Sequence, residues 1–222
     1  MASSPVPEAV SRFRAELRPR AIGPRYQGWG HLAFTSLGSL AVIVFAASQV
    51  RSPTWLELLV VPVSFLVSNV AEYLGHKGPM HNKVPGLGTI FRRHTLEHHR
   101  FFTHEAMAFE STRDFKMVLF PPVMLIFFLG AIATPIGTLA FLLLTPNCGW
   151  LFVATGMSYF LSYEWLHFSY HLPGDHWLAR TRVVARLCRH HTHHHNMAMM
   201  GKWNFNITFP ICDAVMGTTY KE

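Results

Sequence analysis

The sequence has few charged residues and few cysteines. Charged side chains make up 14% of the 222 residues and hydrophobic ones 50%, whereas an ordinary soluble domain carries about 25% charged residues. The three cysteines, Cys148, Cys188 and Cys212, lie far apart, so they indicate neither a disulfide framework nor a CxxC zinc site. Low charge combined with high apolar content predicts an integral membrane protein.

Basic residues outnumber acidic ones, with a formal net charge of +7, but they do not form one continuous basic face. Of nineteen Lys and Arg residues, five lie before position 32, seven lie at 75–116 and six lie beyond position 171. They flank apolar segments, so nucleic acid is not an expected partner. By the positive-inside rule, both termini and the 75–116 segment are expected in the cytoplasm.

Four apolar segments approach the roughly 20 residues that cross about 30 Å of hydrocarbon as a helix. They are 32–50, 55–74, 118–144 and 150–168. The 51–54 linker predicts a tight hairpin between the first two, and Pro135 predicts a kink or break in the third.

The expected fold class is therefore all-α: an integral membrane four-helix transmembrane bundle with a cytoplasmic histidine-rich helical cap. Residues 1–30 are expected to form a partly irregular, cytoplasmic amino-terminal arm. Residues 31–222 are expected to form one membrane-embedded domain.

Histidines are concentrated in four short groups that the apolar segments separate. Five imidazoles fall within 190–195, and the other groups are His76 with His81, His94 with His98 and His99, and His167 with His171. Each ring brings a donor and an acceptor that must be satisfied if buried, so this composition favours a metal site over a packed core. Residues four apart share a helical face, as do His94 with His98 and His167 with His171. The His76–His81 pair, with Gly78 and Pro79 between, predicts a span end that unwinds.

The order of these groups resembles the fatty acid hydroxylase and sterol desaturase superfamily. The chain has H-x4-H after the second apolar segment, an HH-containing cluster, H-x3-H at the end of a segment, and HHxxHH followed by Asn-Phe and Gly-Thr. Phe120-Pro121-Pro122 is similar to the fatty acid hydroxylase branch. The resemblance covers roughly 55–219. It implies a membrane enzyme with two iron ions that uses O2 to hydroxylate a C–H bond of a lipid or fatty acyl chain.

The resemblance also implies the metal ligands. They are His76, His81, His94, His98, His99, His167, His171, His191, His194 and His195. His94 replaces the first histidine of a motif that usually reads H-x2-HH. In the last motif, His191 with His194 and His195 is preferred over His190 with His193 and His194. Four further side chains are expected to orient the ligand rings. They are Glu72, Glu97, Glu164 and Asn206.

The expected partners are the bilayer, a lipid that enters the site from it, and a separate electron-transfer protein or reductase, because the amino-terminal arm is too short for a haem or iron–sulfur domain. The basic cytoplasmic face suits an acidic electron donor. A desaturase and a sterol or carotenoid hydroxylase remain alternatives on the same metal chemistry. A metal transporter is disfavoured because the first and third segments contain no ionisable residue. A zinc hydrolase is also disfavoured, because such a site needs only three ligands and this chain has ten clustered histidines.

Overall fold

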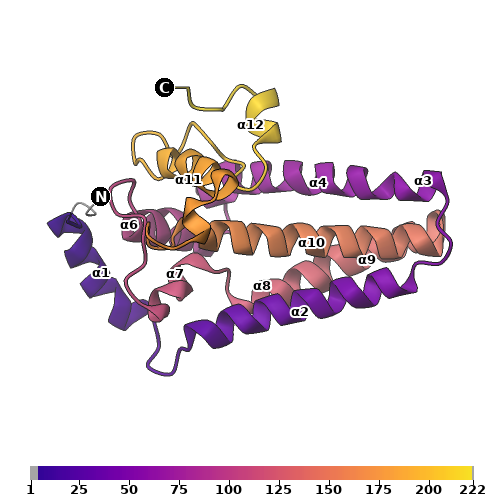
Figure 1. Ribbon diagram of the computed structural model, residues 1–222, viewed down its shortest axis with the longest axis horizontal. Coiled ribbons are helices and arrows are strands. Elements are labelled where there is room, and N and C mark those ends of the chain that lie inside the picture. Colours follow the sequence, from indigo (N-terminus) through magenta and orange to yellow (C-terminus); the bar gives the residue numbers. More distant parts are fainter. Residues whose placement is uncertain (1–4, 222) are drawn as a thin grey trace. The chain divides into compact units, whose positions relative to one another are not determined.

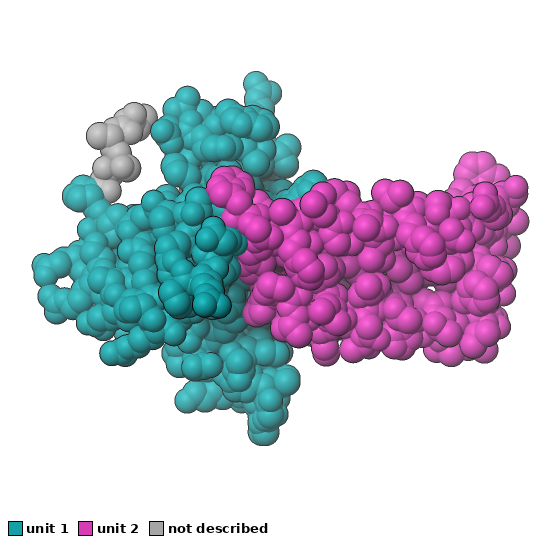
Figure 2. Space-filling view, turned by 90° about the horizontal axis from the view of Figure 1, so that it is seen from below, with its two compact units in different colours: residues 1–28, 71–119, 165–222 teal, residues 29–70, 120–164 magenta. Residues whose placement is uncertain are grey.

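The computed structural model describes residues 5–221, and the regular secondary structure in this range is helical. Its only β-type pairing there is an isolated bridge between Thr103 and Ala106. The chain divides into two compact units, coloured separately in Figure 2. Unit 2 comprises residues 29–70 and 120–164, and unit 1 comprises the remainder.

Unit 2 consists of long apolar helices that run side by side (Figure 1). Its helices are α2 (Gly28–Gln49), α3 (Trp55–Leu58), α4 (Val60–Gly75), α8 (Pro122–Phe127), the π-helical η4 (Phe128–Ala133), α9 (Thr134–Leu143) and α10 (Pro146–Tyr170), of which α4 and α10 continue into unit 1. The predicted hairpin at 51–54 is present between α2 and α3. Thr54 caps α3 by accepting a hydrogen bond from the backbone of Glu57, whose carboxylate in turn accepts from the Thr54 backbone.

Within residues 5–221, three helices are long and apolar enough to cross a membrane. They are Gly28–Gln49, Trp55–Met80 and Pro122–Leu143. Their surfaces carry many exposed apolar side chains, such as Val44 at 65% and Leu142 at 72% exposure, which a bilayer would cover. The protein is thus a membrane protein. Helix α10 is longer than two of these but more polar, and it is not among the three. A fourth crossing and the cytoplasmic position of the cap stay predictions.

The third apolar segment begins later than the sequence predicts, and its irregular turn lies near Pro135. Pro121 and Pro122 separate α7 (Phe115–Val118) from α8, so the span starts at Pro122 rather than Val118. Its irregular turn is η4, just before Pro135. A proline ring collides with the carbonyl four residues earlier in a regular helix. The wider π-helical turn that precedes Pro135 relieves this collision.

Helices α9 and α10 approach each other closely through two glycines in unit 2. A Cβ atom at Gly137 would lie 2.6 Å from Cγ2 of Val153, and one at Gly149 would lie 2.6 Å from the carbonyl oxygen of Gly137. Only glycine permits this backbone contact, which is typical of packed membrane helices.

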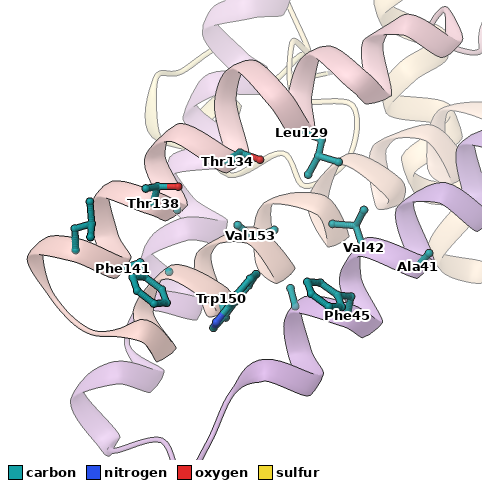
Figure 3. A pocket seen from close by; sticks show the side chains of 13 residues that line it. Ala41, Val42, Phe45, Leu129, Thr134, Thr138, Phe141, Trp150 and Val153 are labelled. Carbon is teal, nitrogen blue, oxygen red and sulfur yellow. The ribbon is translucent and has the colours of Figure 1, made fainter.

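Unit 2 also contains a cavity of about 740 Å³ between α2, α9 and the start of α10 (Figure 3). Its lining is almost entirely apolar, with aromatic rings from Phe45, Phe141 and Trp150. Thr134 and Thr138 contribute the hydroxyl groups seen in Figure 3. Such a lining suits a hydrocarbon chain.

Unit 1 is built from short helices and the ends of α4 and α10. Its remaining elements are α1 (Glu8–Ala21), η1 (His76–Met80), α5 (Gly88–Phe91), η2 (Arg92–His98), α6 (His99–Phe101), η3 (Thr112–Asp114), α7, η5 (Leu178–Arg180), α11 (Arg182–His194) and α12 (Ile211–Val215). The predicted unwinding after the second apolar segment is confirmed, because η1 is π-helical and Gly78 has non-helical angles.

Helix α1 forms part of the amino-terminal arm, and residues 22–27 that follow it are irregular. Arg14 anchors this helix, with only 1% of its surface exposed. Its guanidinium donates hydrogen bonds to the carbonyl oxygens of Phe101 at 2.8 Å and Ala106 at 2.7 Å, and pairs with Glu110 at 2.7 Å. These long-range contacts, which sequence patterns do not reveal, hold the arm against unit 1.

Candidate metal centre

The ten predicted histidines come together in unit 1 as two groups of five. Group A consists of His76, His81, His94, His99 and His194, and group B consists of His98, His167, His171, His191 and His195. Within each group, one nitrogen per ring lies within 4.8 Å of all the others. Each group could therefore hold one metal ion.

Two of the pairs in group A depend on π-helical turns. A π-helix joins residue i to residue i+5, so side chains five apart become neighbours. His94 and His99 are related in this way at η2, and their Nε2 atoms lie 3.1 Å apart. His94 and His98, which the sequence predicts on one helical face, have stacked rings but belong to different groups.

Helix α11 supplies ligand positions to both groups. His194 belongs to group A, whereas His191 and the following His195 belong to group B. His190 turns elsewhere and lies 3.3 Å from the carboxylate of Asp213. Of the two predicted registers, the structure thus brings together the residues of the preferred one. Exposed His104, which the sequence prediction omits, is in neither group.

Five of the ten rings donate a hydrogen bond from Nδ1 to a backbone carbonyl, at 2.5 to 2.9 Å. The pairs are His76 with Phe205, His98 with Met117, His171 with Met107, His194 with Trp203, and His195 with Phe102. A neutral ring with its proton on Nδ1 presents a free lone pair at Nε2. These carbonyls therefore aim five Nε2 lone pairs at the two groups, whereas the sequence predicts that Glu and Asn side chains do so.

The Nε2 atoms of each group face one another at short range. In group A, His81 and His194 are 2.9 Å apart, and in group B, His98 and His167 are 3.2 Å apart. Lone pairs concentrated in this way repel one another unless a positive charge lies between them. The donor set therefore fits a bound cation. Imidazole donors suit iron, copper, zinc or nickel.

Burial keeps these imidazoles neutral at physiological pH. It lowers the pKa of His171 to about 3 and, with a smaller effect of neighbouring His76, the pKa of His81 to about 2. Burial is also the main cause of pKa values well below 6.5 in His94, His98, His99, His191, His194 and His195. A neutral ring is the form that binds metal.

The two groups are direct neighbours. The ring of His99 in group A stacks on the ring of His195 in group B, with centroids 4.3 Å apart and planes 24° from parallel. Two ions bound in the groups would therefore lie close together, as a binuclear centre requires.

The predicted orienting residues have different surroundings. Glu72 accepts hydrogen bonds from the backbone of Ile207 and from the backbone and hydroxyl of Thr208. The Asn206 side chain accepts from the backbone of Cys212. Both residues thus support the segment around Phe205, whose carbonyl receives the His76 proton. The other two are Glu97, which pairs with Arg92 at 3.8 Å, and Glu164, which accepts from the backbone of Phe120 in unit 2.

Sequence reasoning missed Asp213, a buried carboxylate in the same segment. Asp213 accepts hydrogen bonds from the backbone of Phe205 at 2.9 Å and Asn206 at 2.7 Å, and from the hydroxyl of Thr218 at 2.7 Å. Despite its burial, hydrogen bonds from His190 and these groups lower the pKa of Asp213. Its position just before the Gly-Thr ending is the only signal in the sequence that could have drawn attention to it.

Comparison with known proteins agrees with the resemblance seen in the histidine motifs. No curated protein and no solved structure gives a significant match. The family model for fatty acid hydroxylase matches residues 61–218, which is well over half of the chain and includes every histidine of both groups. The chain therefore belongs to the fatty acid hydroxylase family.

Proposed function

We propose that this protein is a membrane-bound di-iron oxygenase that hydroxylates a C–H bond of a lipid or fatty acyl chain. The observation that carries the proposal is the pair of adjacent five-histidine groups in a member of the fatty acid hydroxylase family. Ten neutral imidazoles exceed what a single mononuclear site needs.

Group A would hold one iron and group B the other. The irons would supply the activation of O2. The protein's own contribution is to fix the rings. Backbone carbonyls hold the Nδ1 protons of His76 and His195, and all five rings of group B are buried away from water.

The reaction defines what must reach the site. Hydroxylation consumes one C–H bond, one O2 molecule, two electrons and two protons, and it yields one alcohol and one water. The electrons come from an external donor, which we take to be a separate electron-transfer protein or reductase. The excess of Lys and Arg around the histidine segments favours a cytoplasmic position of the site and both termini.

A lipid substrate is supported by the membrane character of the chain. Three described helices are apolar enough to span a bilayer, and unit 2 contains an apolar cavity of about 740 Å³. A hydrocarbon chain gains free energy from such surroundings in proportion to the apolar area removed from water.

Desaturation, and hydroxylation of a sterol or a carotenoid, are the alternatives on the same metal site. The products discriminate between them: a hydroxylase adds one oxygen atom to the substrate, whereas a desaturase removes two hydrogen atoms.

The test joins metal analysis to lipid analysis. We expect two irons per chain in protein purified in detergent, and lipids that have gained one oxygen atom in cells that express it. The His99→Ala/His195→Ala variant, which removes one ring from each group, should lose both signals, whereas a His176→Ala control should keep them. Purified, folded protein that retains no iron after growth in iron-rich medium would contradict the proposal.

A further inference from the structure

Helix α11 carries three exposed arginines, on the side opposite His191. At 3.6 residues per turn, Arg182, Arg186 and Arg189 fall within an arc of about 60°, and His191 falls on the opposite side. The burial pattern agrees with this geometry, because the three arginines are exposed while His191 and His194 are buried.

This row carries free positive charge, unlike several arginines elsewhere in unit 1. Arg18 pairs with Glu110 and Asp114, and Arg93 donates to backbone carbonyls. Within residues 5–221, no hydrogen bond or ion pair involves the three arginines of α11. The row is therefore available to a partner outside the chain.

The carboxyl-terminal segment that contains the row has few acidic residues. Between Leu172 and Lys221 the sequence has two acidic residues, exposed Asp175 and buried Asp213, against six Lys and Arg. Two exposed apolar side chains lie within five positions of Arg182 in the sequence, Trp177 at 72% and Val183 at 66% exposure. Exposed arginine and tryptophan are both enriched at protein interfaces.

We propose that the α11 row, Arg182, Arg186 and Arg189, is the docking site of an acidic electron-donor protein. The inference rests on the proposed function, because that reaction consumes two electrons. A donor on this face is separated from His191 on the far side of the same helix by about one helix diameter, 10–12 Å. Charge complementarity speeds the encounter and orients the donor.

The experiment uses the full chain, loaded with iron, in nanodiscs of phosphatidylcholine. The probe is an acidic [2Fe–2S] ferredoxin, whose Kd is measured in its oxidised form. We expect Arg182→Glu/Arg186→Glu/Arg189→Glu to raise this Kd at least tenfold. Raising the salt from about 50 to about 300 mM should weaken binding to the unmodified protein and have little effect on the variant.

Two further variants provide the controls. Arg12→Glu/Arg20→Glu/Arg25→Glu makes the same change in net charge at exposed positions and should leave the Kd unchanged. Arg182→Lys/Arg186→Lys/Arg189→Lys keeps the positive charge of the row, so its Kd for ferredoxin should stay within about threefold of the value for the unmodified protein. If the glutamate variant does not fold, as judged by its iron content, Arg186→Glu alone should still raise the Kd by about threefold.

A second measurement separates this inference from the proposed function. The protein is reduced with dithionite without air, freed of dithionite and exposed to O2 for one turnover. The glutamate variant should form as much product as the unmodified protein. Absence of lipid product in both, with the Kd effect intact, would contradict the proposed function and leave the docking site standing.

The docking site is overturned if the glutamate variant binds ferredoxin as tightly as the unmodified protein, or if the charge-matched control loses binding equally. It is also overturned if the unmodified protein turns over after dithionite reduction but does not bind ferredoxin. A different outcome would assign the row to lipid headgroups. In that case, phosphatidylserine nanodiscs would protect the three arginines from modification by phenylglyoxal, and the ferredoxin Kd would be the same for the unmodified protein and the glutamate variant.

Discussion

Nε of Arg14 donates a hydrogen bond to the carbonyl oxygen of Phe101 at 2.8 Å, across 87 positions of the sequence. The next residue, Phe102, receives the Nδ1 proton of His195 on its carbonyl, and its ring lies 4.3 Å from that of His171. Arg14 thus fixes a backbone segment that orients two rings of group B.

Replacement of Arg14 should therefore weaken metal binding without removing a ligand. We expect Arg14→Met to weaken iron retention about 10- to 100-fold, the range found when groups behind metal ligands are removed. Arg14→Lys should recover only part of this loss, because an ammonium group cannot reproduce the fixed fork of donors. Iron release to a chelator measures the effect. Arg12→Met, which breaks an exposed pair with Glu8, is the control, and equal release from both variants would refute the role of Arg14.

Removal of a single ring should be more severe than removal of Arg14. We expect His171→Ala in group B and His194→Ala in group A each to abolish product formation and deplete iron, because the remaining four rings leave an unfilled position and a cavity. The half-buried His176 belongs to neither group, so His176→Ala should keep its iron and activity. Normal turnover by either of the first two variants would rule out the ligand assignment.

Asp213 should support group A more than group B. Its carboxylate accepts from the backbone of Phe205, the residue whose carbonyl holds the His76 ring. Asp213→Asn places an amide donor against donors, which costs about 1–3 kcal/mol for a buried group. We expect lower thermal stability and a lower iron content, measured as iron per chain. Exposed Asp175→Asn is the matched control, and a stoichiometry unchanged by Asp213→Asn would refute this role.

Acid should destabilise the metal-free protein. The pKa of His81 is lowered to about 2 and that of His171 to about 3, whereas an unfolded histidine titrates near 6.5. Below pH 6.5 the unfolded state therefore binds protons that the folded state excludes, and the free energy of unfolding falls by up to about 1.4 kcal/mol per pH unit for each ring. The melting temperature in detergent should fall between about pH 7 and pH 5. His81→Gln should show a shallower dependence, and a flat profile in the parent chain would contradict the buried, neutral state.

The spacing of apolar segments and histidines predicts most of the helical architecture and the set of rings that gather in unit 1. The 32–50 and 55–74 segments correspond to α2 and to α3 with α4, and the unwound turn at Gly78 follows from its Gly-Pro sequence. The grouping of His94 with His99 rather than His98 could not be predicted, because it depends on a π-helical turn that has no distinct sequence pattern.

The partners of the rings were also beyond sequence reasoning. Backbone carbonyls leave no mark in a sequence, so Phe102 and Met107 could not be identified as the acceptors for His195 and His171. The same holds for Arg14, whose contacts join segments about 90 positions apart. The sequence predicts carboxylates near the histidines as orienting groups because side chains, unlike backbone contacts, can be identified from a sequence.

Helix α11 carries His191 of group B and His194 of group A less than one turn apart. An ion that binds in group A would immobilise His194 and, through the rigid helix, bring His191 into register for the second ion. Iron uptake should therefore be cooperative. Native mass spectra recorded during a titration with Fe²⁺ should contain chains with no iron and chains with two, and few with a single ion.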